Sequence, residues 1–158
     1  MPIDSPTFRS VLGRFPSGVT VVTAQDQTGE DHGMTASAFC SLSLQPPLVL
    51  LCVERSTDMH PVLESASRFV VNVLSSDQEP ISRRFAERLG DKFEGVGYSR
   101  GMTGAVILDD VHAFIECSSF AHYPGGDHSI FVGEVLYAEA REGRPLLYYR
   151  GGYTELAR

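Results

Sequence analysis

The apolar residues of this chain gather in short runs rich in valine, isoleucine and aromatic residues, separated by segments that contain glycine, proline or polar residues. Runs of this kind are typical of β-strands, which favour β-branched and aromatic side chains. The longest unbroken apolar run, residues 48–53, is six residues long, whereas a membrane-spanning helix needs roughly 20. We therefore expect no membrane span. The predicted strands are residues 18–24, 48–53, 69–74, 111–120, 130–140 and 145–149.

Helical periodicity is restricted to three segments. The first begins at Ser5, whose hydroxyl we expect to cap the helix before Pro6, and continues to Phe15 with apolar residues at helical spacing. The others are residues 61–67 and 81–89. Because strands outnumber helices and no linker is evident, we expect a mainly β protein with peripheral helices, an antiparallel barrel rather than a doubly wound parallel sheet. We expect one domain over residues 1–158.

Charge and targeting signals narrow the range of partners and compartments. The formal net charge is −7, and Lys92 is the only lysine among 13 cationic residues, so we expect no nucleic-acid partner. Any phosphate site must depend on local donors. The first residues lack a basic and then apolar signal sequence, which favours the cytoplasm. Cys40, Cys52 and Cys117 are too widely spaced for a disulfide framework or a zinc site, and we expect reduced thiols in the core.

Several catalytic signatures are absent from the sequence. Residues 95–100 come nearest to a dinucleotide-binding glycine motif but lack its third glycine and follow no predicted strand. There is no Walker loop, no pair of histidines or cysteines at metal-ligand spacing, and no nucleophile elbow. We therefore expect neither a metal site nor acyl-transfer chemistry.

A row of hydroxyl groups marks residues 33–43. Thr35, Ser37, Ser41 and Ser43 share parity, so in an extended chain they would project from one face. This row is either a solvated strand face or a set of donors that holds a phosphate or the polar edge of a heterocycle without cationic charge.

Two further segments carry candidate site residues. In residues 54–61, Ser56, Thr57 or Asp58 could cap a helix, and Arg55 would add a strong phosphate partner. The alternative is an ordinary capped helix with a surface arginine. In residues 123–128, a glycine-containing turn delivers His128 to the start of a strand, where it is either a surface residue or a catalytic one.

These segments, taken in order, resemble the flavin reductase family with the FMN-binding split-barrel fold, the small reductase components of two-component flavin monooxygenases. The resemblance extends nearly end to end, and residues 123–128 make the chain most like actinomycete reductases that supply reduced flavin in aromatic polyketide pathways. The matching blocks are residues 15–24 (FPSGVTVVTA), 33–39 (GMTASAF), 41–49 (SLSLQPPLV), 69–74 (FVVNVL), 116–117 (EC), 126–128 (GDH) and 131–135 (FVGEV).

The resemblance implies a six-stranded antiparallel split β-barrel, a homodimer with flavin near the subunit interface, and hydride transfer from NAD(P)H to FMN or FAD. It assigns Asp127 and His128 to the nicotinamide side as catalytic residues, with Tyr153 a weaker candidate beside a short C-terminal tail. The residues that it implies for cofactor binding are Thr35, Ala36 and Ser37 at the flavin ring, Ser41, Cys52, Val53, Arg55, Ser56, Thr57 and His60 around the ribityl phosphate, and Phe85 on the helix at residues 81–89.

The function that follows is an NAD(P)H:flavin oxidoreductase that supplies reduced flavin to a partner monooxygenase. We expect NADH to be preferred, because residues 121–131 contain no arginine or lysine for a 2′-phosphate. The alternative is a flavin-binding carrier or electron-transfer module without turnover. An oxidase acting on a pyridoxal-type phosphate is disfavoured, because the sequence lacks a cluster of basic phosphate ligands.

Overall fold

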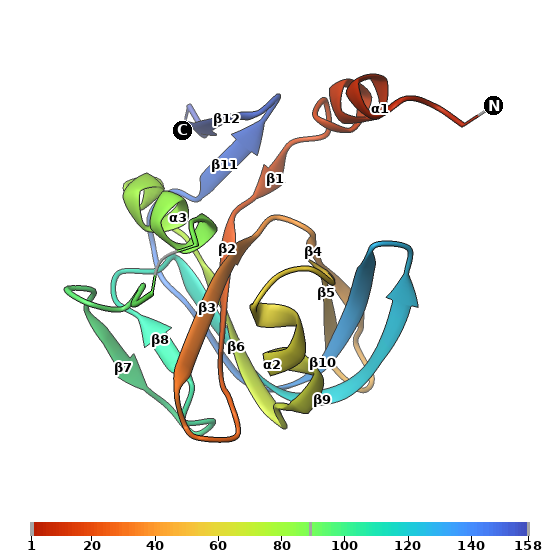
Figure 1. Cartoon of the computed structure of the whole chain (residues 1–158). Coiled ribbons are helices and arrows are strands. Elements are labelled where there is room, and N and C mark those ends of the chain that lie inside the picture. The colour runs from red at the N-terminus through yellow and green to blue at the C-terminus, as the bar shows by residue number, and fades with distance from the viewer. Residues whose placement is uncertain (1, 89, 158) are drawn as a thin grey trace.

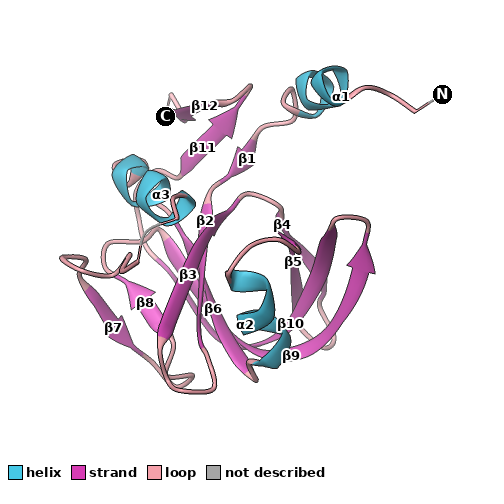
Figure 2. Ribbon diagram, in the orientation of Figure 1, coloured by secondary structure: helices cyan, strands magenta, loops and turns pink. Residues whose placement is uncertain are grey.

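The computed structural model describes residues 2–88 and 90–157 and shows a mainly β fold with three helices, as Figure 2 shows by colour. The prediction of a mainly β protein is confirmed. Within the described residues, no helix has the length and apolar character needed to cross a bilayer. Of the residues that sequence analysis placed in the third helix, Leu89 lies outside the described residues.

Seven antiparallel strands form the main sheet in the order β3, β2, β6, β9, β10, β5, β4, and the sheet curls around helix α2, Met59–Ser65 (Figure 1). The expectation of six strands therefore differs from the seven found here. The seven strands are β2 (Thr20–Gln25), β3 (Asp31–Ala36), β4 (Phe39–Ser43), β5 (Leu48–Glu54), β6 (Arg68–Val73), β9 (Ala113–Gly125) and β10 (His128–Ala140).

The edge strands of this sheet, β3 and β4, are separated in sequence only by Ser37 and Ala38. Three backbone steps, from Ala36 to Phe39, span at most about 11 Å. The two edges must therefore approach each other, and the sheet curls into a barrel. Among the described residues, β3 and β4 are not hydrogen-bonded to each other, so the barrel is open between them. The hydroxyl-rich segment thus supplies two strands at opposite edges of one sheet.

Five shorter strands of the described part of the chain lie outside the main sheet. β1 (Ser17–Gly18), β11 (Leu146–Tyr149) and β12 (Gly152–Glu155) form a three-stranded sheet. β7 (Tyr98–Arg100) and β8 (Val106–Leu108) form a ribbon, which sequence analysis missed. Buried side chains of the main sheet hold β8, because Thr23 Oγ1 donates to the Val106 carbonyl at 2.6 Å and Asn72 Oδ1 accepts from the Leu108 N–H at 2.9 Å.

The barrel has apolar packing on both faces of its central strands. On β2 and β6, neighbouring residues alternate between two clusters, so Val21 and Val70 enter one while Val22 and Val71 enter the other. The first cluster also contains residues of α3 (Glu79–Ala86) and β8, and the second contains residues of α2. Both helices are therefore fixed against the sheet by buried apolar contact.

The first helix, α1, is shorter than predicted and is capped by a different residue. It runs Ser5–Leu12, and its N-cap is Asp4, whose carboxylate accepts the Thr7 N–H at 2.8 Å. The prediction that Ser5 caps this helix is wrong. Gly13 closes the helix by donating to the Arg9 carbonyl, so the helix ends before the predicted limit at Phe15.

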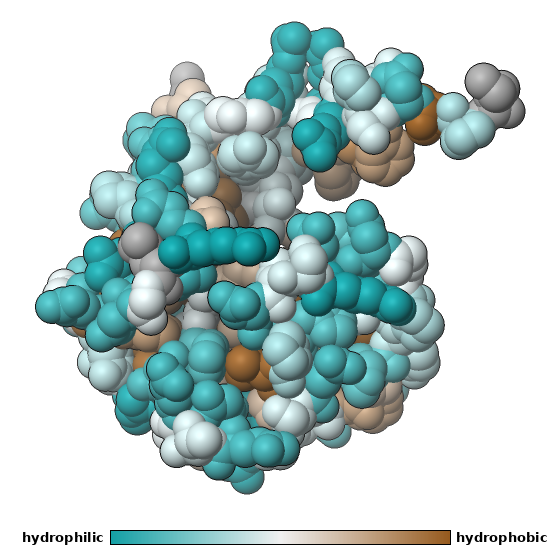
Figure 3. All heavy atoms as spheres, in the orientation of Figure 1, coloured by the Kyte–Doolittle hydropathy of each residue, from teal (hydrophilic) through white to brown (hydrophobic). Residues whose placement is uncertain are grey.

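The apolar side of α1 is exposed among the described residues. No residue of the helix is buried, and Phe15, just beyond it, is 80% exposed. Figure 1 shows α1 projecting from the body, and Figure 3 shows apolar side chains gathered on its underside, toward the open space beside the barrel. An amphipathic helix of this kind needs a second apolar surface.

The three cysteines are all free thiols, but they occupy different environments. Cys117 is buried, and burial raises the pKa of its thiol to about 12. Cys52 is half-buried, and burial raises the pKa of its thiol as well. Cys40 is exposed on β4, so the expectation of three core thiols is wrong for this residue. An edge strand leaves one side of its backbone and half of its side chains open, which explains the exposure.

Candidate cofactor site

The end of β5 and the turn before β10 lie side by side. His128 pairs with Glu54 across the two strands, and the Arg55 N–H donates to the Asp127 carbonyl at 2.9 Å. This bond joins the predicted phosphate residue Arg55 to the predicted catalytic pair Asp127 and His128. The structure therefore brings together two segments that are more than 70 residues apart in sequence.

Asp127 and His128 form a close hydrogen-bonded pair at this turn. His128 Nδ1 lies 2.6 Å from Asp127 Oδ1, and the hydrogen bond from His128 holds the pKa of the Asp127 carboxyl below its usual range. The His128 side chain is 43% exposed and that of Asp127 is 85% exposed. Because Asp127 engages Nδ1, Nε2 is the ring nitrogen that can meet a ligand. Gly126 permits the turn with a φ of 69°.

The segment that follows β5 exposes polar groups at the same place. Arg55 and Ser56 are exposed, while the Thr57 hydroxyl donates to the Glu54 carbonyl at 2.7 Å and shapes the turn. Asp58 occupies the N-cap position of α2, but its side chain makes no capping bond. Asp58, one of the three predicted caps, is therefore at the N-cap position, but its side chain does not make the expected capping hydrogen bond. Arg55 and Ser56 remain available as anion donors.

The hydroxyl row divides at the crossing from β3 to β4. Thr35 and Ala36 end β3, Ser37 lies in the crossing, and Ser41 is on β4. The Cys52 N–H donates to the Ala38 carbonyl at 3.0 Å, which fastens the crossing to β5. The single extended face expected for these residues does not exist, because the strand is interrupted. Ser37 and Ser41 are nevertheless exposed near the end of the barrel where its edges meet.

Thr35 belongs to a contact group that also includes Tyr153. The Thr35 hydroxyl donates to the Ser82 carbonyl at 2.6 Å, and the Ser82 hydroxyl lies 2.7 Å from the Tyr153 hydroxyl. Helix α3 thereby joins a predicted flavin-ring residue to a predicted nicotinamide residue. Sequence analysis did not select Ser82, which is fully buried.

Three other predicted cofactor residues have little or no exposed side chain. Val53 and Phe85 are 0% exposed and lie in the two apolar clusters. His60 is 8% exposed, and both ring nitrogens have protein partners: Nε2 lies 2.8 Å from Ser129 Oγ, and Nδ1 lies 3.1 Å from Glu64 Oε1. The structure therefore gives these side chains packing contacts within the protein, and Cys52 beside Val53 is half-buried.

A cleft of about 780 Å³ opens between β3, the start of α2 and the chain beyond α3. Lys92 is half-buried in its wall, where the ammonium donates to the carbonyls of Gly33 and Phe85 at 3.1 Å each. Burial lowers the pKa of Lys92. Since an ammonium has three N–H donors, one remains for a ligand. The lining includes His32, Met34, Thr57, Met59, Phe85, Lys92 and Phe93.

The cleft adjoins the predicted site, because Met34 precedes Thr35 and Thr57 follows Ser56. Its volume is in the range of small-molecule pockets. Sequence analysis noted that Lys92 is the only lysine but gave it no role. The structure places this lysine in the wall of the cleft, beside the candidate cofactor residues, so being the only lysine was the signal that could have identified it.

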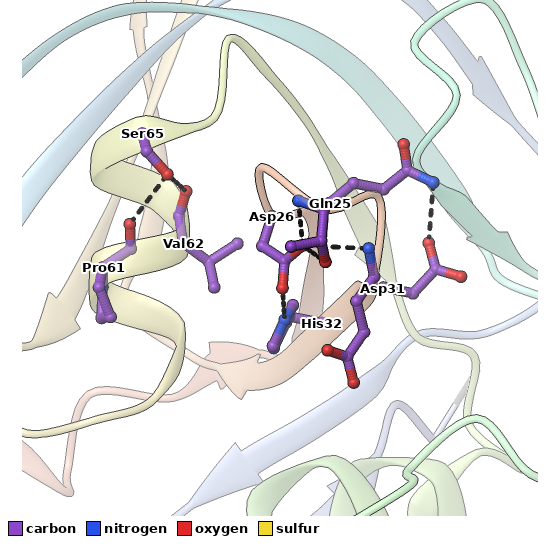
Figure 4. A network of polar contacts seen from close by, with 9 residues as sticks. Gln25, Asp26, Asp31, His32, Pro61, Val62 and Ser65 are labelled. Atoms are coloured by element: carbon purple, nitrogen blue, oxygen red, sulfur yellow. Dashed lines mark hydrogen bonds and ion pairs between the residues drawn. The ribbon is translucent and has the colours of Figure 1, made fainter.

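Next to the cleft, the turn between β2 and β3 carries a polar network (Figure 4). His32 Nε2 lies 2.8 Å from Asp26 Oδ2, and Gln25 donates to Asp31. Hydrogen bonds, chiefly from the Thr28 hydroxyl and then from His32, hold the pKa of Asp26 well below its usual range. Asp26, Glu30 and His32 place three potential ligand atoms within 4.8 Å. The hydrogen bonds within the turn account for this cluster, and we assign no metal to it.

The fold and the exposed donors define a small barrel protein with a cleft of small-molecule size beside its open edge. Residues 12–157 match the flavin reductase like domain, and the chain belongs to this family. It is 42% identical over 149 residues to the actinorhodin polyketide dimerase of Streptomyces coelicolor, covering 94% of this chain and 84% of that protein. It is 42% identical over 153 residues to HsaB, the reductase subunit of a flavin-dependent monooxygenase of Rhodococcus jostii, covering 96% and 78%.

A solved structure supports the same family assignment. The NADH:FAD oxidoreductase SgcE6 of Streptomyces globisporus, in complex with NAD and FAD fragments, superposes with a TM-score of 0.92 at 39% identity. The match covers 99% of this chain and 98% of that one. The resemblance inferred from the sequence blocks is thus confirmed.

Proposed function

We propose that this protein is an NADH-dependent flavin reductase that transfers hydride to FMN or FAD and supplies the reduced flavin to a partner monooxygenase. One observation carries the proposal: in a chain of the flavin reductase family, the residues predicted to bind phosphate and nicotinamide meet where Arg55 contacts Asp127. Relatives named as an NADH:FAD oxidoreductase and as a monooxygenase reductase subunit support the same reaction.

The chemistry requires positioning more than acid–base catalysis. A bound flavin supplies a ring that accepts hydride, and transfer needs the donor carbon about 3 to 3.5 Å from the accepting nitrogen. Arg55 and Ser56 can hold the flavin phosphate, with Thr35, Ala36, Ser37 and Ser41 near the ring and chain. His128, oriented by Asp127, can bind the nicotinamide carboxamide or stabilise the negative charge that develops as flavin is reduced.

The test is steady-state NADH oxidation with excess FMN or FAD. Many turnovers per protein chain are the expected result. The alternative function, a flavin carrier or electron-transfer module, predicts tight flavin binding with no more than one equivalent of NADH consumed. Running the assay with both flavins also measures the FMN or FAD preference.

We further propose a preference for NADH over NADPH. Residues 121–131 contain no arginine or lysine for a 2′-phosphate. Carboxylates outnumber cations in the cleft lining, where Glu30, Asp31, Asp58, Glu87, Asp91 and Glu94 face Arg88 and Lys92, and the net negative charge would repel such a phosphate. A kcat/KM at least tenfold higher for NADH is expected, and comparable values for the two nucleotides would contradict this preference.

A second copy of this chain is the proposed occupant of the open apolar surface, giving a homodimer with flavin near its interface. The exposed groups lie on and just beyond α1 and in and just beyond β4, the edge strand that carries the candidate cofactor residue Ser41. Sedimentation is expected to show a dimer, and a fully active monomer at micromolar concentration would contradict it. The exposed apolar residues are Phe8, Val11, Leu12, Phe15, Leu42 and Leu44.

The remaining predictions concern organisation and compartment. We propose that residues 1–158 act as a single flavin reductase-like domain, supported by a family match that spans residues 12–157. We also propose that the protein works in the cytoplasm, where NADH is available. Cell fractionation with an antibody to the chain tests the compartment.

A further inference from the structure

Ser82 lies between Thr35 and Tyr153, two candidate site residues that are far apart in the sequence. It lies on α3 and is 0% exposed. Its backbone carbonyl accepts the Thr35 hydroxyl at 2.6 Å, and its side-chain hydroxyl lies 2.7 Å from the Tyr153 hydroxyl. One buried residue therefore contacts β3 through its main chain and β12 through its side chain.

The bond from Thr35 fixes the polarity of its hydroxyl. A threonine hydroxyl has one proton to donate and two lone pairs that accept. Because the proton is directed to the Ser82 carbonyl, only the lone pairs can meet a ligand. Thr35 is half-buried, so part of the residue is open to solvent. Toward a flavin, such an oxygen can accept from an N–H group and cannot donate to a carbonyl or an unprotonated ring nitrogen.

Tyr153 is held firmly enough to fix Ser82. The Arg83 guanidinium lies over the Tyr153 ring at 5.0 Å from its centroid, and the Tyr148 ring meets it edge-on at 5.3 Å. Strand pairing between β11 and β12 sets the Tyr153 backbone opposite Tyr148. With its ring fixed by these contacts, the Tyr153 hydroxyl reaches Ser82 and is engaged there.

We infer that Ser82 is a positioning residue that sets Thr35 as a hydrogen-bond acceptor toward a flavin N–H group, and that Tyr153 acts through Ser82 rather than on the nicotinamide. This inference rests on the proposed function. It links the C-terminal hairpin, β11 and β12, to flavin affinity through a path of two hydrogen bonds. Tyr153 is accordingly not a catalytic residue.

The experiment is a double-mutant cycle on FMN binding, measured by fluorescence titration without NADH. Thr35→Val removes the acceptor and is expected to raise the FMN Kd by about three- to tenfold, the loss expected for one hydrogen bond. Thr35→Ser keeps the hydroxyl and is expected to retain wild-type affinity. Tyr153→Phe leaves Ser82 without its side-chain partner and is expected to raise the Kd by about two- to threefold, with no further effect when Thr35 is already valine.

Tyr148→Phe is the matched control, because it removes a hydroxyl from the neighbouring tyrosine of the same hairpin and is expected to leave the FMN Kd unchanged. Additive effects of Tyr153→Phe and Thr35→Val would overturn the inference. So would a Tyr153→Phe variant whose KM for NADH rises while its FMN Kd stays the same. A wild-type chain that binds no FMN would instead overturn the proposed function, and this assignment with it.

Discussion

Replacement of His60 tests whether this buried histidine supports the fold or the cofactor. Its Nε2 and Ser129 Oγ are 2.8 Å apart, both residues are buried, and the His60 ring meets Phe131 edge-on at 5.3 Å. His60→Leu fills similar space but leaves the Ser129 hydroxyl buried and unpaired, which costs about 1 to 3 kcal/mol. Loss of the ring contact adds about 0.5 to 1 kcal/mol. We expect the free energy of unfolding to fall by about 1.5 to 4 kcal/mol.

The assay is equilibrium unfolding in urea, with FMN titration of the folded variant beside it. The double variant His60→Leu with Ser129→Ala removes both polar partners, so about 1 kcal/mol or more of the lost stability is expected to return. Glu64→Gln is the control, because the Glu64 side chain is 48% exposed and its bond to His60 is worth little. We expect that variant to stay within about 0.5 kcal/mol of wild type.

The FMN Kd of the His60→Leu protein is expected to stay within a few-fold of wild type. A loss of affinity above tenfold with unchanged stability would refute this reasoning and return His60 to the ribityl-phosphate site. A double variant no more stable than the single one would refute the account of the buried hydrogen bond.

Three further outcomes are expected. His128→Ala should lower kcat or raise KM for NADH while oxidised-flavin affinity stays within a few-fold, and unchanged stopped-flow reduction at every NADH concentration would leave His128 with a structural role only. Arg55→Gln or Ser56→Ala should raise the Kd of FMN more than that of riboflavin, and equal losses would place the phosphate elsewhere. Asp31 has its pKa lowered mainly by the hydrogen bond from Arg100, so its contribution to stability is present above the ordinary aspartate pKa and is lost as pH falls through the lowered value. Asp31→Asn should therefore destabilise the protein at pH 7, and the loss should shrink as pH falls through the lowered pKa; a loss in urea unfolding that stays the same at every acidic pH would contradict this.

The strands that are buried on both faces could be predicted from the sequence, because a run of apolar and β-branched side chains by itself indicates such a strand. Runs such as residues 69–74 are apolar at every position except Asn72, and the structure places this run in the middle of the sheet. β7 and β8 could not, since each has only three residues. Part of what holds β8 is the pair of bonds to Thr23 and Asn72, which a local pattern does not contain.

The candidate site also contains residues that the local sequence could identify and residues that depend on long-range contacts. Exposed Arg55 and the turn before His128 could be identified from local residue types. Thr35 and Ser82 are 47 positions apart, and Ser82 and Tyr153 are 71 apart. Neither contact could therefore be predicted from the periodicity of the local sequence. His60 is the opposite case: its residue type alone suits a ligand site, while its ring is buried against Ser129, a contact that the local sequence does not show.

The two-residue crossing between β3 and β4 acts as a spacer whose length the fold determines. Surface connections usually tolerate insertions. Here Ser37 and Ala38 join opposite edges of one sheet, and the Ala38 carbonyl accepts a hydrogen bond from the Cys52 N–H. One added residue would widen the opening of the barrel and move Thr35 away from Ser41. Changes of chain length that alter substrate choice should therefore occur elsewhere, for example beyond the C-terminal hairpin, where the barrel is not affected.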